Sequence, residues 1–285
     1  MARILDGQAL AKQLRSSLAD ELRNMHGSPH IVVVLSYPDP ASQIYVKHKL
    51  LACQEVGIRT TVLNQEYDST SALLAALNTW NNNEDIDGIL VQFPLHPNVD
   101  QSAIMQHICP EKDIDGVHPD NLGKLVMEDS SGFVPCTPLG IQTLLSSNDI
   151  FLPGKHVVII GRSVTVGKSL ALLLSQKNSR ANATVTLAHS ATDNLPKLCK
   201  SADIIIAAAG CPHLVTRDMV HEKSIVIDVG INRRGNDGNS RLIGDVDFES
   251  VSKVCAAISP VPGGVGPMTI ASLLQNSVKS FRKRV

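Results

Sequence analysis

The sequence has almost no net charge and no long apolar run. Lysine and arginine total 26 against 27 aspartate and glutamate residues, so the formal net charge is −1. A chain without a global positive field is not expected to hold a nucleic-acid backbone or an anionic membrane surface. The longest apolar runs, such as IIIAAA, are far shorter than the roughly 20 residues that a membrane-spanning helix needs. We therefore expect neither nucleic acid nor a membrane as a partner.

The cysteines are few and scattered. There are six, and no two of them form a C-x-x-C pair. This spacing argues against a zinc cage or a disulfide framework, so we expect no metal site. The first residues, MARILDGQALAKQLRSSLADEL, carry charges throughout and predict a strand followed by an amphipathic helix. That pattern differs from a secretory signal or a membrane anchor, and we expect a cytoplasmic protein with reduced thiols.

Apolar runs rich in β-branched residues recur between helical stretches along the 285 residues. Near-continuous apolarity is typical of strands that are covered on both faces, as in a parallel sheet with crossover helices. The length favours two α/β domains over one. The runs begin at Ile31, Thr60, Gly88, His156, Ala183, Asp203 and Ser224.

A segment rich in proline and glycine, from FVPCTPLG to NDIFLPGK, precedes a fresh series of strands and helices. It predicts a domain boundary near residues 140–153. We assign residues 1–145 to an N-terminal α/β substrate and catalytic domain, and residues 146–267 to a C-terminal Rossmann-type domain with a parallel sheet. Residues 268–285 predict a last amphipathic helix, which we expect to pack back on the first domain.

The second domain begins with a strand, HVVIIG, that leads into GRSVTVG and then into an apolar helix. Gly161 and Gly167 would let the backbone approach a phosphate, and the helix N-terminus would supply amide groups. The ending Gly-Lys-Ser also imitates a P-loop ATPase. A P-loop has four residues between its glycines, whereas this loop has five, so the spacing favours a dinucleotide site.

The end of the next strand, ATVTLAHS, bears on the choice of cofactor. NAD enzymes usually present an acid there to the ribose 2′-hydroxyl, but this chain has His189 and Ser190. Without a carboxylate to repel a 2′-phosphate, and with Arg162 and Ser163 in the first turn, NADP is the expected cofactor. The alternative is that Arg162 only caps or salt-bridges the loop.

The first domain carries polar residues where a ligand could bind. A helix predicted after Asp39 places Tyr45 and Lys49 on one face, because they are four residues apart. The strand GILVQF places Gln92 at the C-terminal end of an apolar run, at the sheet edge where open α/β proteins bind ligands. The loop PEKDIDGVHPDN contains Asp115. Each residue also has an ordinary explanation: a solvated lysine, a packing tyrosine, a glutamine satisfying loop backbone, or turn chemistry.

Eight segments occur in a recognisable order and cover nearly the whole chain: SQIYVKHK, GILVQFPL, PEKDIDG, FVPCTPLG, GRSVTVGKS, DVGIN, GDVDF and PVPGGVGPMT. Together they resemble the bifunctional methylenetetrahydrofolate dehydrogenase/methenyltetrahydrofolate cyclohydrolase family. The resemblance implies NADP-dependent oxidation of 5,10-methylenetetrahydrofolate to 5,10-methenyltetrahydrofolate, followed by hydrolysis to 10-formyltetrahydrofolate. It also implies a folate cleft between the two domains and a homodimer.

The resemblance further implies roles for particular residues. Lys49 would be catalytic, Tyr45 would stack along the folate, Gln92 would position the lysine, and Asp115 would hydrogen-bond the pterin. A lysine that assists proton transfers near neutral pH needs a lowered pKa, which burial and a neutral amide partner allow. Substrate binding would also involve Pro262, Gly263 and Gly264. The implied cofactor-binding residues are Gly161, Arg162, Ser163, Val166, Gly167, His189, Ser190 and Ile231.

Five positions depart from the family pattern, and none of them removes a catalytic group. Ser36 and Tyr37 replace a glycine-containing turn, Ser169 replaces a proline, and Phe93 and His96 replace leucine and proline. Two other functions stay open at this point. One is an NADP-dependent oxidoreductase like shikimate dehydrogenase, and the other is a nucleotide-binding protein without turnover.

Overall fold

The computed structural model describes residues 2–234 and 241–284, and the chain divides into two compact units. The six-stranded unit comprises Met1–Ala11 and Thr137–Thr269, and the three-stranded unit comprises Lys12–Cys136 and Ile270–Val285. This division by contacts places residues 1–11, 137–145 and 268–269 with the larger sheet, whereas the sequence predicted that they belong to the first domain. The assignment of domains by function stays a prediction.

The three-stranded unit is built on a parallel sheet in the order β3-β2-β4. Its central strand β2 and its neighbour β4 are buried almost throughout, as their β-branched, apolar runs predict. Strand β3 lies at the edge and is half exposed. The strands are β2 (His30–Leu35), β3 (Arg59–Asn64) and β4 (Gly88–Val91).

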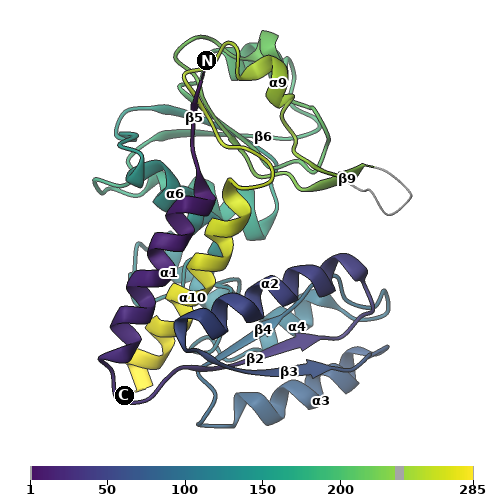
Figure 1. Ribbon diagram of the computed structural model, residues 1–285. Coiled ribbons are helices and arrows are strands. Elements are labelled where there is room, and N and C mark those ends of the chain that lie inside the picture. The colour runs from purple at the N-terminus through teal and green to yellow at the C-terminus, as the bar shows by residue number, and fades with distance from the viewer. Residues whose placement is uncertain (1, 235–240, 285) are drawn as a thin grey trace. The chain divides into compact units, whose positions relative to one another are not determined.

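Helices cover both faces of this sheet (Figure 1). Helix α2 packs on the face that carries Val33 and Leu90, and α3 and α4 pack on the face that carries Val32 and Ile89. The helices of this part of the chain are α2 (Pro40–Val56), α3 (Thr70–Asn81), α4 (Gln101–His107) and α5 (Pro119–Val126).

Helix α2 begins and ends where its sequence predicts. The Asp39 side chain accepts a hydrogen bond from the Ser42 backbone N–H at 2.7 Å, which satisfies a donor at the helix N-terminus. Gly57 ends the helix in the left-handed conformation, with φ of 87°, where a glycine is favoured. The helix bearing Tyr45 and Lys49 is therefore fixed at both ends.

The last helix, α10 (Val265–Arg284), returns to the three-stranded unit. Leu273, Leu274 and Val278 join the buried cluster under β2 together with residues of α1 (Gly7–Arg23). The Asn276 side chain donates hydrogen bonds to the backbone oxygens of Ile114 at 2.9 Å and Val134 at 3.0 Å. The prediction that this helix packs back on the first domain is confirmed.

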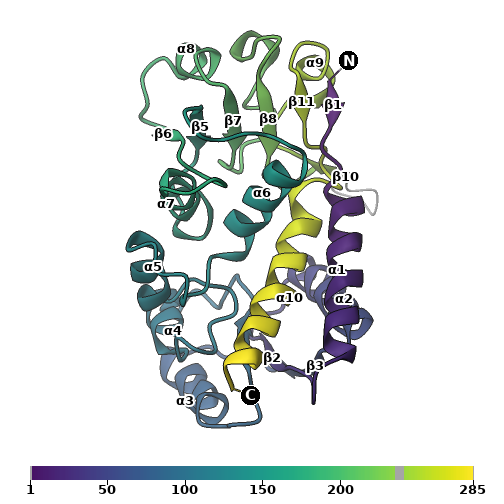
Figure 2. The same cartoon turned by 90° about the vertical axis from the view of Figure 1, so that its left-hand side faces the viewer.

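The six-stranded unit contains a parallel sheet in the order β1-β11-β8-β7-β5-β6 (Figure 2). The chain leaves β5 for β6 on one side and later continues on the other side with β7, so the order reverses at β5. Ligands of open α/β sheets bind at the carboxyl ends of the strands beside such a reversal. The strands are β1 (Arg3–Ile4), β5 (His156–Ile160), β6 (Thr184–Ala188), β7 (Ile204–Ala207), β8 (Ile225–Asp228) and β11 (Ala257–Ile258).

Further helices and a small two-stranded sheet belong to the described part of this unit. An antiparallel pair, β9 (Asn232–Arg234) and β10 (Arg241–Ile243), follows β8. The helices are α6 (Cys136–Ser147), α7 (Ser169–Ser175), α8 (Leu195–Lys200) and α9 (Phe248–Val251). Within residues 2–234 and 241–284, no helix has the length and apolar character needed to cross a bilayer.

Candidate active site

Lys49 and Gln92 meet at the carboxyl edge of the three-stranded sheet. The Lys49 Nζ donates a hydrogen bond to Gln92 Oε1 at 3.0 Å, and the lysine is only 6% exposed. The Gln92 Nε2 donates to the backbone oxygen of Phe93 at 2.8 Å. Because that contact occupies the amide nitrogen, the amide oxygen faces the lysine. The helix and the strand that the sequence singled out therefore do bring these two side chains together.

The surroundings of Lys49 favour its neutral form. Burial lowers the pKa of Lys49, and the nearby Asp115 carboxylate opposes that effect without overcoming it. The lysine Nζ lies 4.7 Å from the centroid of the Tyr45 ring, one helical turn earlier on α2. Burial also raises the pKa of Cys53 to about 12 and that of Cys136 well above its ordinary value, so both neighbouring thiols stay uncharged.

The turn that carries Asp115 is shaped by its neighbour, Asp113. The Asp113 carboxylate is buried and accepts hydrogen bonds from the backbone N–H of His118 at 2.8 Å and of Gly116 at 3.1 Å. It also accepts one from Asn121 Nδ2 at 2.8 Å. Burial is the largest influence on the pKa of Asp113 and raises it. Asp113 thus stabilises the turn, whereas Asp115 is only half-buried and its charge acts on Lys49.

Two residues that build this turn, Asn121 and Asn276, were not predicted from the sequence, whereas Asp113 lies in the loop for which turn chemistry was an alternative. Asn121 lies in the same Asx-rich stretch, a composition that indicates side chains bonded to the local backbone. Asn276 donates from α10 to a turn some 140 or more residues away, at Val134 and Ile114. No local pattern in the sequence marks such a contact.

The glycine turn after β5 requires both of its glycines. A Cβ on Gly161 would lie 2.0 Å from the Ala208 backbone oxygen, and one on Gly167 would lie 2.0 Å from the Gly161 backbone oxygen. The intervening chain forms a π-helical turn, Val164–Lys168, which Ser163 caps by accepting a hydrogen bond from the Val166 N–H at 3.2 Å. Close packing of strand and helix therefore explains this loop in part, as in other dinucleotide-binding turns.

Ser169 differs from the serine of a P-loop. It is 1% exposed, and its hydroxyl donates to the Val164 backbone oxygen within the π-helical turn. In a P-loop that hydroxyl contacts the magnesium ion. The ATPase reading, which the loop length already disfavoured, therefore also conflicts with the burial of this side chain.

The residues proposed to bind the 2′-phosphate of the cofactor lie at the carboxyl ends of two neighbouring strands. Arg162 and Ser163 follow β5, and His189 and Ser190 follow β6, which is paired with β5 at Ile160↔Ala188. Arg162, Ser163 and Ser190 are exposed, and His189 is half-buried. The His189 N–H donates to Thr192 Oγ1 at 2.8 Å, which fixes the turn beyond β6.

Ile231, Pro262, Gly263 and Gly264, which were also predicted to bind the ligands, belong to the six-stranded unit. Ile231 follows β8 and is 56% exposed. Pro262 follows a cis peptide bond, and Gly263, with φ of 105°, accepts a hydrogen bond from the Gln8 N–H at 2.9 Å. A Cβ on Gly264 would lie 2.5 Å from the Pro260 backbone oxygen, so this position requires glycine. Tyr45, Lys49, Gln92 and Asp115 lie in the other unit.

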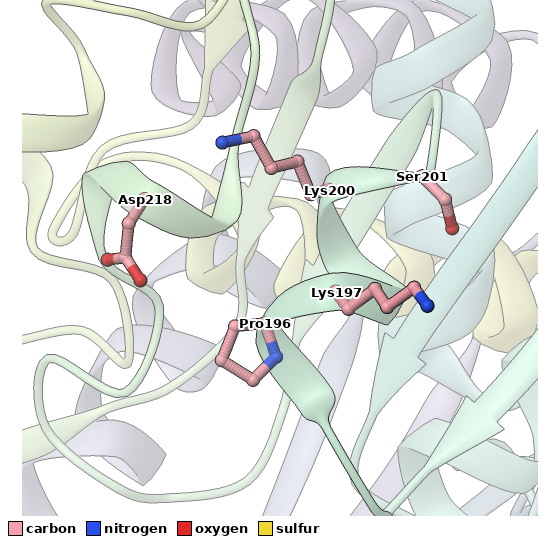
Figure 3. Close-up of a pocket in the computed structure, with 5 residues that line it drawn as sticks. All are labelled: Pro196, Lys197, Lys200, Ser201 and Asp218. Carbon is pink, nitrogen blue, oxygen red and sulfur yellow. The ribbon is translucent and has the colours of Figure 1, made fainter.

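A hollow of about 350 Å³ lies elsewhere on the six-stranded unit (Figure 3). It contains none of the predicted site residues, and its two lysine side chains extend in different directions. Among residues 2–234 and 241–284, no group of three or more His, Cys, Asp and Glu side chains is arranged to hold a metal ion. The hollow is lined by Pro196, Lys197, Lys200, Ser201 and Asp218.

Comparison with protein families identifies the chain. The catalytic domain of tetrahydrofolate dehydrogenase/cyclohydrolase matches residues 5–115, and the NAD(P)-binding domain of the same enzymes matches residues 135–285. The chain belongs to the tetrahydrofolate dehydrogenase/cyclohydrolase family. The predicted family, the two-domain α/β fold, the dehydrogenase and cyclohydrolase activities and the nicotinamide cofactor are thereby confirmed.

Individual relatives agree with this family membership. The bifunctional protein FolD of Aquifex aeolicus is 45% identical, over 100% of this chain and 97% of its own. The solved FolD of Campylobacter jejuni superposes with a TM-score of 0.94 at 44% identity, covering 100% of both chains. The Trypanosoma brucei FolD, solved with NADP and an inhibitor, has a TM-score of 0.93 at 34% identity, covering 99% and 98%.

Shikimate dehydrogenase shares only the fold with this tetrahydrofolate dehydrogenase/cyclohydrolase. The enzyme from Listeria monocytogenes superposes with a TM-score of 0.51 at 15% identity, covering 90% of this chain and 93% of its own. Similarity at that level carries no information on substrate. The alternative prediction of a shikimate-dehydrogenase-like enzyme therefore has no support beyond a common architecture.

Proposed function

We propose that this enzyme oxidises 5,10-methylenetetrahydrofolate with NADP and hydrolyses the methenyl product to 10-formyltetrahydrofolate, with Lys49 as the group that moves the proton in hydrolysis. The observation that carries the proposal is the buried Lys49 amine. Its Nζ donates a hydrogen bond to Gln92 Oε1 at 3.0 Å, and the Asp115 carboxylate lies close enough to influence its pKa. An amine whose pKa is lowered by burial can take up a proton near neutral pH.

Each neighbouring residue has a chemical task in this proposal. Bound NADP would accept the hydride from the methylene carbon. The methenyl bridge that remains is cationic, and Lys49 would take a proton from the water that attacks it. Gln92 would hold the lysine Nζ, and the Tyr45 ring would offer an apolar face to the folate. The Asp115 carboxylate would match the paired N–H donors of the aminopyrimidine ring.

The preference for NADP over NAD rests on the edge formed by β5 and β6. Arg162, Ser163, His189 and Ser190 lie there, and they would contact the 2′-phosphate of the adenosine half. We also propose that Val166, Gly167 and Ile231 line the cofactor site. The PGGVGP loop, through Pro262, Gly263 and Gly264, would approach the ligands by its backbone. A comparison of kcat/KM with NADP and with NAD tests the cofactor preference.

We further propose that the enzyme is a cytoplasmic homodimer. Edge strand β3 has one side that no strand of residues 2–234 and 241–284 covers, and its Val62 is 43% exposed. Such an edge suits pairing with a second copy. Light scattering on the purified protein should give twice the mass of one chain. The Val62→Lys variant should give a lower mass than the wild type. Fractionation of cells that produce the protein tests the compartment.

Lys49→Ala and Lys47→Ala form a matched pair that tests the catalytic assignment. Both lysines are on α2, but Lys47 is exposed and Lys49 is buried against Gln92. Lys49→Ala should remove hydrolysis of methenyltetrahydrofolate, which is measured by the decrease of the absorbance of that substrate. The circular dichroism spectrum should stay that of a folded protein. Lys47→Ala should keep the wild-type rate. Full cyclohydrolase activity in Lys49→Ala would refute the role of this lysine.

A further inference from the structure

Asp245 lies where three donors from two different turns converge on one carboxylate. It is 0% exposed, and its Oδ2 accepts hydrogen bonds from the backbone N–H of Ala209 at 2.7 Å and of Gly210 at 2.8 Å. Its Oδ1 accepts one from Asn232 Nδ2 at 2.9 Å. A single side chain therefore connects the turn after β7 with the segment after β8.

A second buried carboxylate, Asp228, holds Asp245 in turn. It is 2% exposed, and its Oδ1 accepts hydrogen bonds from the backbone N–H of Gly230 at 3.1 Å and of Asp245 at 2.9 Å. Its Oδ2 accepts one from the Val246 N–H at 3.0 Å. The backbone on both sides of the Asp245 side chain is thus fixed from the end of β8.

Two glycines allow the carboxylates to come this close to the backbone. A Cβ on Gly230 would lie 2.1 Å from Asp245 Oδ1, and a Cβ on Gly244 would lie 1.7 Å from Asp228 Oδ2. Any other residue at either position would displace a carboxylate. The segments DVGIN and GDVDF therefore supply both the acids and the space that the acids occupy.

The turns joined by Asp245 lie at a defined place in the sheet. Strands β7 and β8 are neighbours and lie on the side of β5 opposite to β6. In a Rossmann-type sheet the two sides of the reversal each receive one nucleotide of the dinucleotide. In the proposed function the glycine turn after β5 and the end of β6 receive the adenosine nucleotide. The turns after β7 and β8 consequently face the nicotinamide nucleotide.

We propose that Asp245 is a positioning residue for hydride transfer, which holds the turns at Ala209–Gly210 and Gly230–Asn232 in the arrangement that receives the nicotinamide half of NADP. Asp228 supports it by fixing its backbone. This inference rests on the proposed NADP-dependent oxidation. An asparagine would not replace Asp245, because an amide carries no negative charge, and its NH₂ group would face the Asn232 NH₂ group unless the Asn232 amide turned over.

Asp245→Asn is the decisive variant. The loss of a hydrogen bond to a buried charged group predicts a rise of about tenfold to a hundredfold in the KM for NADP in the dehydrogenase reaction, with a fall in kcat. Two quantities should stay at the wild-type level. They are the affinity for 2′,5′-ADP, which occupies only the adenosine half, and the hydrolysis of methenyltetrahydrofolate measured without NADP.

Asp203→Asn is the matched control. Asp203 also accepts a backbone hydrogen bond in the same sheet, from the His156 N–H at 2.9 Å, but at the amino ends of the strands. It should leave the KM for NADP unchanged. If Asp245→Asn does not fold, Asn232→Ala removes one donor and leaves Ala209 and Gly210 bonded. It should then show a smaller loss of NADP affinity, again without change in 2′,5′-ADP binding.

Two results would overturn this inference and leave the proposed function standing. One is a parallel loss of dehydrogenase and cyclohydrolase activity in Asp245→Asn, which would mean a purely structural role. The other is an equal loss of affinity for NADP and 2′,5′-ADP. The proposed function is tested separately by the wild-type chain. If that chain forms no NADPH from methylenetetrahydrofolate, the proposed function fails and this inference fails with it.

Discussion

Replacing Gln92 by glutamate should convert the partner of Lys49 from a neutral amide into a charge. The Lys49 Nζ lies 3.0 Å from Gln92 Oε1, and a carboxylate oxygen at that position would attract an ammonium group. With an effective dielectric constant of about 20, the attraction is about 5 kcal/mol before the desolvation of the new carboxylate is subtracted. The burial that lowers the pKa of Lys49 would be opposed, and the lysine would stay protonated.

The pH dependence of hydrolysis is the assay for this change. In the wild type the lowered pKa of Lys49 means that the neutral amine forms at a lower pH than for a solvated lysine. The alkaline rise of the cyclohydrolase rate should therefore move to higher pH in Gln92→Glu. Since general base catalysis contributes about a hundredfold or more, the rate near neutral pH should fall by a similar factor.

A charge added at an exposed position of α2, the helix that carries Lys49, provides the control. Gln54 lies exposed on α2, so Gln54→Glu introduces the same charge in solvent and should leave the pH profile unchanged. An unshifted profile and an undiminished rate in Gln92→Glu would refute the idea that a neutral Lys49 assists hydrolysis. A profile that shifted as much in Gln54→Glu would refute it too.

Two predictions concern stability. Leu274 is 0% exposed in the cluster under β2, so Leu274→Ala should lower the free energy of unfolding by about 2 to 5 kcal/mol in urea titrations, and a loss well below that range would show that α10 contributes little. Burial raises the pKa of Asp228 from its ordinary value of 3.8 to about 7, so its protonated form stabilises the fold at low pH, and that contribution is lost progressively as the pH rises from about 4 to 7. Between pH 4 and pH 8 the wild type should therefore lose up to roughly 4 kcal/mol relative to Asp228→Asn, and parallel stability curves would contradict this.

The sequence predicts those features that depend on local periodicity. The apolar runs at Ile31 and His156 predicted strands covered on both faces, and the spacing of Tyr45 and Lys49 predicted a shared helix face. Gln92 was predicted because it ends a strand at the edge where ligands bind. These inferences need only the chain geometry of a helix or a parallel sheet, which is the same in every protein.

Residues that act through long-range packing could not be found in this way. Asp113 and Asp115 are two acids in one loop. Only the folded turn shows that Asp113 is buried and bonded to the local backbone, whereas Asp115 is half-buried. Asp245 binds the N–H groups of Ala209 and Gly210, and its carboxylate is enclosed only because β8 and β7 are adjacent. Which distant segments meet is decided by tertiary structure, and one sequence carries little direct record of it.

Neither unit is a continuous stretch of chain, and this restricts how the enzyme can be dissected. The boundary between the two units lies within two unbroken helices. It falls after Ala11 in α1 and after Thr269 in α10. A fragment limited to residues 137–269 would lack strand β1, which pairs with β11. A fragment limited to residues 12–136 would lack the side chains of Leu274 and Val278 beneath its sheet. Proteolytic or genetic separation would therefore yield two incomplete pieces, so the enzyme has to be expressed, folded and engineered as one chain.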